Sequence, residues 1–229
     1  MWKCRCLPWR TTACGALLFR TRRLHSTPLW PFASALTWAM PETFEQRVEA
    51  ILRRDALRWR LLDAVSHLEL PDCWIAAGFI RNAVWDALHG RTPQPPGCDV
   101  DVIWFDPDRC HERLDRDIEE KLRAVVPSIE WSVKNQARMH ARNDDKPYDS
   151  SSDAMRYWPE TATAVAARIC GRDQLEIASP LGLDDLFKLL LRPTQRFANE
   201  KLPIYEERVR SKAWIELWPL LKRAEPPFA

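Results

Sequence analysis

The chain has 229 residues, enough for one large domain or two small ones. Hydrophobic residues make up 46% of it, and 12 tryptophans raise the aromatic share to 10%, which excludes a disordered chain. The formal net charge of +2 is uneven, because residues 1–41 contain six Lys or Arg residues and no acid, so the remainder carries −4. A mildly acidic body gives no support to a broad nucleic-acid-binding surface.

Residues 1–40 form a basic leader that is distinct from the remainder, 41–229. The leader is rich in arginine and lacks acids, which is the composition of a mitochondrial transit peptide. Two alternatives compete with that interpretation: an over-extended start, with Met40 as the initiator, and a disordered basic tail. We favour the start at Met40 and therefore expect a cytoplasmic protein, or a mitochondrial one if the leader is a genuine transit peptide.

Hydrophobic periodicity predicts the elements of the body in chain order. One or two helices are expected over 41–70, then a strand at 73–77, a helix at 79–90, a strand at 98–105, a helix at 107–127 and a strand at 128–135. Residues 144–160 are polar and contain prolines, so they predict a surface excursion. Strands at 161–169 and 174–180 and helices at 182–191 and 205–221 complete the chain.

Strands interleaved with helices predict an α+β domain with a small sheet flanked by helices at both ends of the chain. The short turn between the strands at 161–169 and 174–180 predicts a hairpin, so the sheet is expected to be mixed. No apolar run is long enough to span a membrane.

Two acids stand one residue apart in the apolar run "CDVDVIWF". Side chains alternate along a strand, so Asp99 and Asp101 point to one face with Cβ atoms roughly 7 Å apart. Carboxylates placed in this way can converge on Mg²⁺, and a pair of metal ions supports phosphoryl or nucleotidyl transfer. For the bare pattern, a solvated face of an edge strand is the better interpretation.

A glycine at the preceding strand-to-helix junction favours the metal-site interpretation of the two aspartates. Gly78 follows the strand at 73–77 and opens the next helix, where free N–H groups and the lack of a side chain let a phosphate approach closely. Arg81 lies one turn into the same helix and could reach a phosphate oxygen. An anion site beside a metal site is what a Mg²⁺–nucleoside triphosphate complex requires.

The segments "AGFIRN" and "DVDV" together resemble the polymerase-beta-like nucleotidyltransferase superfamily, and in particular the G-G-x-V-R-D … D-I-D-I pattern of CCA-adding tRNA nucleotidyltransferases. The resemblance places Ala77 and Gly78 on the paired glycines, Arg81 on the arginine and Asn82 on the aspartate. It also assigns Asp99 and Asp101 to the two metal-binding acids and implies two Mg²⁺ ions.

The resemblance further implies a third metal-binding and catalytic carboxylate, Glu176, in the strand "LEIASP". Glu130, in "SIEWSV", is the alternative, and the pattern does not choose between them. More closely, residues 44–195 resemble a bacterial family of nucleotidyltransferase-like proteins of unknown substrate. This match favours Asn135 and Arg138, in "VKNQARMH", as further nucleotide-binding residues.

The sequence therefore predicts a Mg²⁺-dependent nucleotidyltransferase that moves a nucleoside monophosphate from a nucleoside triphosphate to an acceptor hydroxyl. A small molecule or a protein is expected as the acceptor rather than tRNA, because the body is acidic and shows no counterpart of the tRNA-binding domains. The alternative is a non-catalytic nucleotide-binding or regulatory module on the same fold.

Overall fold

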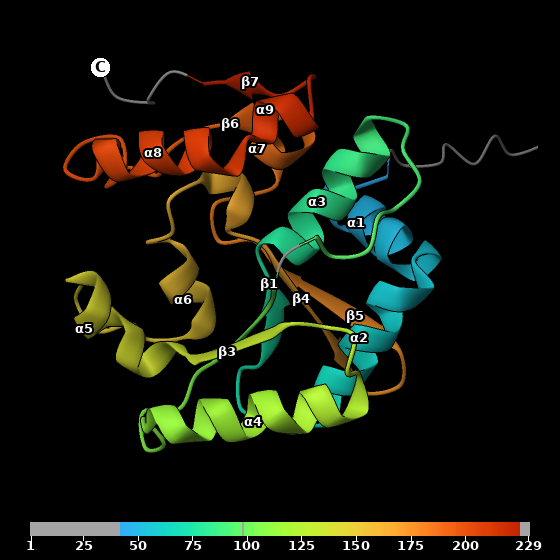
Figure 1. Cartoon of the computed structure of the whole chain (residues 1–229), viewed down its shortest axis with the longest axis vertical. Helices are drawn as coiled ribbons and strands as arrows, with labels where there is room; N and C mark the ends of the chain where they lie inside the picture. Colours follow the sequence, from blue (N-terminus) through green and yellow to red (C-terminus); the bar gives the residue numbers. More distant parts are fainter. Residues whose placement is uncertain (1–41, 98, 225–229) are drawn as a thin grey trace, which may run out of the picture. The chain divides into compact units, whose positions relative to one another are not determined.

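A computed structural model describes residues 42–97 and 99–224 (Figure 1). The predicted leader lies outside the described residues. The helices are α1 Phe44–Arg54, α2 Ala56–Ser66, α3 Gly78–Leu88, α4 Glu112–Val125, α5 Met139–Asn143, α6 Ser151–Met155, α7 Asp184–Phe187, α8 Leu202–Lys212 and α9 Trp214–Leu217. The strands are β1 Trp74–Ala76, β2 Val100–Trp104, β3 Trp131–Asn135, β4 Ala166–Cys170, β5 Gln174–Ala178, β6 Leu190–Leu191 and β7 Lys222–Arg223.

The first two helices begin at polar caps that the sequence supplies. Thr43 and Gln46 form a capping box at the start of α1. Asp55 then leaves the helical conformation, with φ −98° and ψ 94°, and its carboxylate accepts a hydrogen bond from the N–H of Arg58 to start α2. The single predicted region over 41–70 is therefore two helices that meet at one capping residue.

The main sheet is mixed, as the sequence predicted. Its strand order is β3-β2-β1-β4-β5, with β2 and β3 parallel and the other neighbouring pairs antiparallel. The strands β4 and β5 form the expected hairpin, and Gly171 and Asp173 in its turn have positive φ angles of 56° and 60°. The α+β class is thus confirmed.

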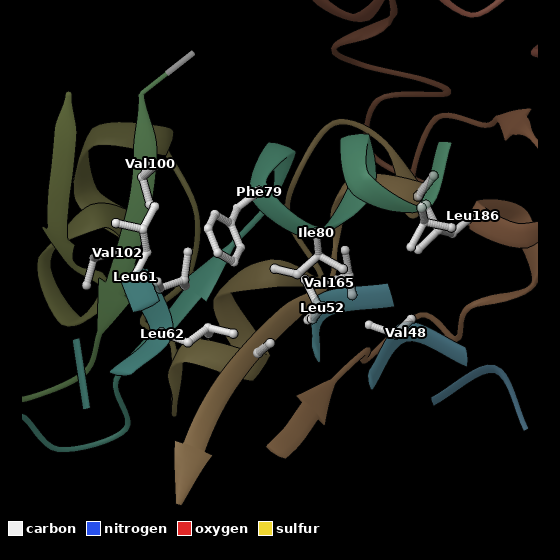
Figure 2. Close-up of a cluster of buried hydrophobic side chains, with 14 of the residues drawn as sticks. Val48, Leu52, Leu61, Leu62, Phe79, Ile80, Val100, Val102, Val165 and Leu186 are labelled. Carbon is white, nitrogen blue, oxygen red and sulfur yellow. The ribbon is translucent and has the colours of Figure 1, made fainter. Parts of the chain in front are cut away.

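One face of the sheet carries the main hydrophobic core. Helices α1 to α4 contribute buried aliphatic and aromatic side chains to this core. Figure 2 shows those of α1, α2 and α3 beside β2. On β2 the alternate residues Val100 and Val102 belong to this core and are fully buried. Because side chains alternate along a strand, Asp99 and Asp101 are left for the opposite face.

A smaller cluster of buried side chains covers part of that opposite face. Trp74 and Ala76 of β1 pack there with Ile103 of β2, Ala166 of β4 and Met155 of α6. Met155 belongs to 144–160, the predicted surface excursion, and is fully buried. That prediction is wrong in part, because the segment places an apolar helical turn on the sheet between its polar stretches.

The C-terminal part also differs from the prediction. Only Asp184–Phe187 of the helix expected at 182–191 is helical, and Leu190–Leu191 instead pairs with Lys222–Arg223 as a parallel two-stranded sheet. The helix expected at 205–221 is divided at Ala213, which adopts a left-handed conformation with φ 49°. In the described part of the chain, no helix has the length and apolar character needed to cross a membrane.

Candidate nucleotide and metal site

The register of the sheet brings the acidic strand beside the start of α3. Ala76 of β1 pairs with Asp101 of β2 on one side and with Ala166 of β4 on the other, while Ser132 of β3 pairs with Asp101. The chain turns from β1 into α3 immediately after Ala76, so the N-terminus of α3 lies next to the end of β2 that carries the acids.

A cleft of about 230 Å³ opens over the paired residues Asp101 and Ser132. Asp101 and Ile103 line it from β2, Ser132 and Lys134 from β3, and Ala77 from the start of α3. Its other walls come from segments distant in the sequence, and they include Trp158, Pro159, Thr163 and Arg208. The cleft therefore combines carboxylate, hydroxyl, cationic and aromatic groups at the end of a helix.

Asp101 is the less exposed of the two acids. The pKa of Asp101 is raised from 3.8 to about 6, first by burial and then by the neighbouring charge of Asp99, while the Ser132 hydroxyl, Arg208 and Arg81 act in the lowering direction. Asp99 is exposed to solvent. A desolvated carboxylate beside a second carboxylate is costly when ionised, and a cation between them removes that cost.

The donor set fits a hard divalent cation. Asp99 and Asp101 offer oxygen ligands from one face of one strand, and the Ser132 hydroxyl lies on the adjacent strand. Among residues 42–97 and 99–224, however, no group of three His, Cys, Asp or Glu side chains is close enough to hold a metal ion. A cation here would complete its shell with substrate oxygens or water.

Ala77 holds the backbone in an unusual conformation at the start of α3. Its φ of 57° and ψ of −123° lie in a region that glycine adopts and that L side chains rarely do. Its methyl group cannot cap the helix, so Gly78 presents the N-terminus of α3 without a capping side chain. This is the position at which the CCA-adding pattern has its first glycine.

We therefore expect Ala77→Gly to raise the free energy of unfolding by about 1 kcal/mol. Relief of the strain contributes about 1–3 kcal/mol, and the added freedom of the unfolded chain offsets part of it. Urea denaturation checks this, with Ala76→Gly as the control, because Ala76 lies one residue earlier in regular β1 and is fully buried. A loss of stability in Ala77→Gly as large as that in Ala76→Gly would contradict the strain.

Arg81 and Asn82 form one hydrogen-bonded unit beside the cleft. The Nε and Nη2 atoms of Arg81 donate to Oδ1 of Asn82 at 3.2 and 2.9 Å, and Nη1 donates to Oγ1 of Thr163 at 2.7 Å. The Arg81 guanidinium also lies 4.4 Å from the ring centre of Trp214. Arg81 is thus held against Thr163, which lines the cleft, and Asn82 orients it.

Asn135 and Arg138 do not join this site. The side-chain amide of Asn135 donates to the carbonyl oxygens of Asp106 and Arg109 at 2.8 and 2.9 Å, and its Oδ1 accepts from the N–H of Ala137 at 3.0 Å. Arg138 pairs with the buried carboxylate of Asp115. Both side chains stabilise the loops at the end of β3, neither lines the cleft, and nucleotide contacts by them stay a prediction.

Glu176 shares the face of Asp101 but is not brought to it. Ala178, two residues on, continues the Asp101 row, and β1 and β4 separate β5 from β2, which at about 4.8 Å per strand is about 14 Å. The carboxylate of Glu176 is instead paired with Arg168 at 2.6 Å, and this hydrogen bond lowers its pKa. The three-acid cluster expected with Glu176 is therefore not formed.

Glu130 is nearer to the pair in the sheet. It precedes β3, and its carbonyl oxygen accepts a hydrogen bond from the N–H of Val100 at 2.8 Å, so its backbone lies beside that of Asp99 and Val100. Its side chain is exposed. Ser132 is the residue of β3 that pairs with Asp101. It was not identified from the sequence, although its alternation with the buried Trp131 and Val133 places its side chain on the face of Asp101.

Comparison with known proteins decides the family. A family model described as "Nucleotidyltransferase" matches residues 63–223, which is more than half of the chain. The chain belongs to this nucleotidyltransferase family. The resemblance inferred from "AGFIRN" and "DVDV" is thereby confirmed, and with it nucleotidyl transfer as the class of chemistry.

A solved structure agrees with the fold of this nucleotidyltransferase. A protein whose NMR structure "reveals a CCA-adding enzyme head domain" is 34% identical, with a TM-score of 0.70 over 79% of this chain and 95% of that one. A CCA-adding enzyme in complex with CTP is 14% identical, with a TM-score of 0.49 over 78% of this chain and 43% of that one. A tRNA-processing enzyme complex gives 15% identity, a TM-score of 0.46 and coverages of 72% and 43%. No curated protein matches the chain.

Proposed function

We propose that this nucleotidyltransferase uses Mg²⁺ to transfer a nucleoside monophosphate from a nucleoside triphosphate to an acceptor hydroxyl. The observation that carries the proposal is Asp101, a largely buried carboxylate beside Asp99 in a cleft at the N-terminus of α3. In the reaction the acceptor oxygen bonds to the α-phosphorus, the bond from that phosphorus to the β-phosphate oxygen breaks, and pyrophosphate leaves. The hydroxyl proton passes to solvent.

The chain's own groups have separate tasks in this proposal. Asp99 and Asp101 hold the metal, which when bound supplies positive charge to the reacting phosphate and to the leaving pyrophosphate. The N–H groups at Gly78 and the following turn bind phosphate oxygens, helped by the partial positive charge at a helix N-terminus. Arg81, oriented by Asn82, adds a fixed cation at the same end of the cleft.

The acceptor that we propose is a small molecule or a protein side chain. Residues 42–229 carry a net charge of −4, which opposes the binding of a polyanionic RNA over a broad surface. The family match and the head-domain likeness are compatible with several acceptors. A screen with α-phosphate-labelled triphosphates in cell extract would identify what becomes labelled, with Asp101→Asn as the inactive control.

A non-catalytic nucleotide-binding module remains the second candidate. It is favoured by the absence, within the described residues, of a third acid clustered with Asp99 and Asp101. Such a module would bind a Mg²⁺–triphosphate complex but would release no pyrophosphate with any acceptor. Pyrophosphate release in extract, measured for wild type and for Asp101→Asn, therefore separates the two candidates.

We expect Mg²⁺ affinity to fall about tenfold when the pH is lowered from 7 to 5. The pKa of Asp101 is raised to about 6, so the carboxyl is ionised at pH 7 and largely protonated at pH 5, and a protonated carboxyl is a poor cation ligand. Calorimetric titration with MgCl₂ measures the change. Glu176→Gln is the control and should keep the wild-type profile, because Glu176 is paired with Arg168 away from the cleft.

An equal Mg²⁺ affinity at pH 7 and pH 5 would exclude Asp101 as a ligand. If Glu176→Gln instead removed Mg²⁺ binding, Glu176 would be the third acid, as the sequence predicted. The metal-bound protein would then have to bring Glu176 closer to Asp101 than it lies in this structure.

A further inference from the structure

Arg208 is the cleft residue that comes from the C-terminal helix α8. We propose that it binds a phosphate group of the nucleoside triphosphate and that Glu160 positions it for this task. The inference rests on the proposed function and adds a residue of the substrate-binding site that neither sequence motif contains. It also gives the C-terminal helices a direct part in binding.

Arg208 is held firmly on one side of its guanidinium. Its Nε donates to Oε1 of Glu160 at 2.8 Å, and Glu160 is fully buried. The guanidinium also lies 5.4 Å from the ring centre of Trp214, which is itself buried. An arginine fixed through Nε and an aromatic face loses little further freedom when its other groups bind an anion.

The remaining side of the guanidinium is available to a ligand. Arginine has five N–H donors, and within residues 42–97 and 99–224 only the Nε donor of Arg208 makes a protein hydrogen bond. The side chain is 33% exposed and lines the cleft together with Asp101. Two Nη groups in a fork are suited to bidentate binding of a phosphate.

The charges around the cleft also favour an anion at this place. Arg81 and Arg208 lie on the same Trp214 ring, at 4.4 and 5.4 Å from its centre, so two like charges are held near each other. Glu160 offsets one of them, and Asp99 and Asp101 would be neutralised by bound Mg²⁺. Lys134, which also lines the cleft, is paired with Glu119 at 3.1 Å. With Mg²⁺ bound, the cleft would therefore offer the Nη groups of Arg208 to an anion.

Glu160 has a geometry that suits a positioning residue. Its Oε2 atom is buried and, within the described part of the chain, has no hydrogen-bond partner, so Arg208 is its one ionic anchor there. Removing Arg208 alone would leave an unpaired buried carboxylate and destabilise the fold. A test of Arg208 therefore needs a variant in which both charges are removed together.

The experiment compares full-length variants by equilibrium binding of Mg²⁺–nucleoside triphosphate and of Mg²⁺–tripolyphosphate. Arg208→Gln and the double variant Glu160→Gln/Arg208→Gln should each weaken both ligands about 10- to 100-fold. Arg208→Lys should recover part of the affinity. Glu160→Gln alone should give a smaller loss, because Arg208 is present but no longer anchored by a charge.

Arg210→Gln is the matched control. Arg210 lies on the same helix with the same charge, is 74% exposed and pairs with Glu207 rather than with any cleft residue. It should leave both affinities within about twofold of wild type.

Three results would overturn the proposal. Wild-type affinity in the folded double variant would remove Arg208 from the site while leaving the proposed function intact. A loss for the triphosphate without a loss for tripolyphosphate would place Arg208 on the nucleoside instead of the phosphates. Failure of the wild-type protein to bind any triphosphate would overturn both the proposed function and this inference.

Discussion

In metal-free buffer at pH 7.5, Asp101→Asn should raise the free energy of unfolding by up to about 3 kcal/mol and reduce nucleotidyl transfer at least about 100-fold. The two effects have one cause. Asp101 is desolvated and faces Asp99, so its ionised form is disfavoured in the folded protein and its pKa rises to about 6. Asparagine has nearly the same shape without the charge, and it is a poor ligand for Mg²⁺.

The pH dependence fixes the sign of this stability effect. The raised pKa means that the folded protein binds the proton more tightly than the unfolded chain, so the penalty is full above about pH 6 and disappears below the unfolded value of 3.8. The gain from Asp101→Asn should therefore be present at pH 7.5 and close to zero at pH 3.5. Chemical denaturation at both pH values measures it.

Asp99→Asn is the companion variant, because it removes the neighbouring charge while Asp101 remains. It should also abolish transfer and should give a smaller gain in stability, since Asp99 is exposed and loses little solvation on folding. A clear fall in stability for Asp101→Asn at pH 7.5 would show that the pair has a structural role in place of a metal-binding one.

Gly78→Val should weaken the binding of a Mg²⁺–nucleoside triphosphate about 100-fold while changing Mg²⁺ affinity by less than about twofold. Gly78 is the first residue of α3, beside the row that contains Asp101. A branched side chain there would keep a phosphate away from the N–H groups at the helix N-terminus, whereas the carboxylates on β2 are unaffected. Calorimetric titrations with MgCl₂ and with the triphosphate measure the two affinities.

Ala56→Val provides the control for Gly78→Val. Ala56 is the first residue of α2, is exposed, and follows the capping residue Asp55, so it receives a similar side chain at the start of a helix far from the cleft in the sequence. It should leave both affinities unchanged. Because Gly78 is buried, Gly78→Ala is also required, as a milder variant that retains the fold. Wild-type triphosphate affinity in folded Gly78→Val would remove Gly78 from the site.

The strands and helices near the motif could be predicted from the sequence because local patterns determine them. The alternation of Asp101 with Val100 and Val102 predicts which face each side chain occupies, and the burial of the two valines and the register of Asp101 agree with it. Gly78 begins α3, with Ala77 alone between it and β1. In these segments the hydrophobic period and the turn residues agree with the tertiary structure.

The neighbours of the acids on other strands could not be predicted in the same way. Alternation gave Glu176 the correct face, but only strand order shows that β1 and β4 lie between it and Asp101. Asn135 and Arg138 stand in a polar run suited to a ligand, yet Asn135 donates to backbone carbonyl groups and Arg138 pairs with Asp115. Polarity alone does not distinguish a ligand-binding side chain from one that makes structural hydrogen bonds within a loop.

Arg208 gave no signal in the sequence at all. It lies in the charged segment "YEERVR" of α8, and its proposed role depends on the buried Glu160 from another segment. Similarly, Leu190 and Leu191 continue an apolar run typical of a helix, and they become a strand only because Lys222 and Arg223 pair with them. For Leu190 and Leu191, long-range pairing overrides local propensity.

The origin of Arg208 in α8 also bears on the order in which the cleft is completed during synthesis. The ribosome delivers β1, β2 and β3 early, so the two aspartates can be brought together while α8 has not yet been made. Until α8 and Trp214 pack against the sheet, Asp99 and Asp101 lack the nearby guanidinium of Arg208. The cleft is therefore complete only when the C-terminal helices have been synthesised and have packed against the rest of the domain.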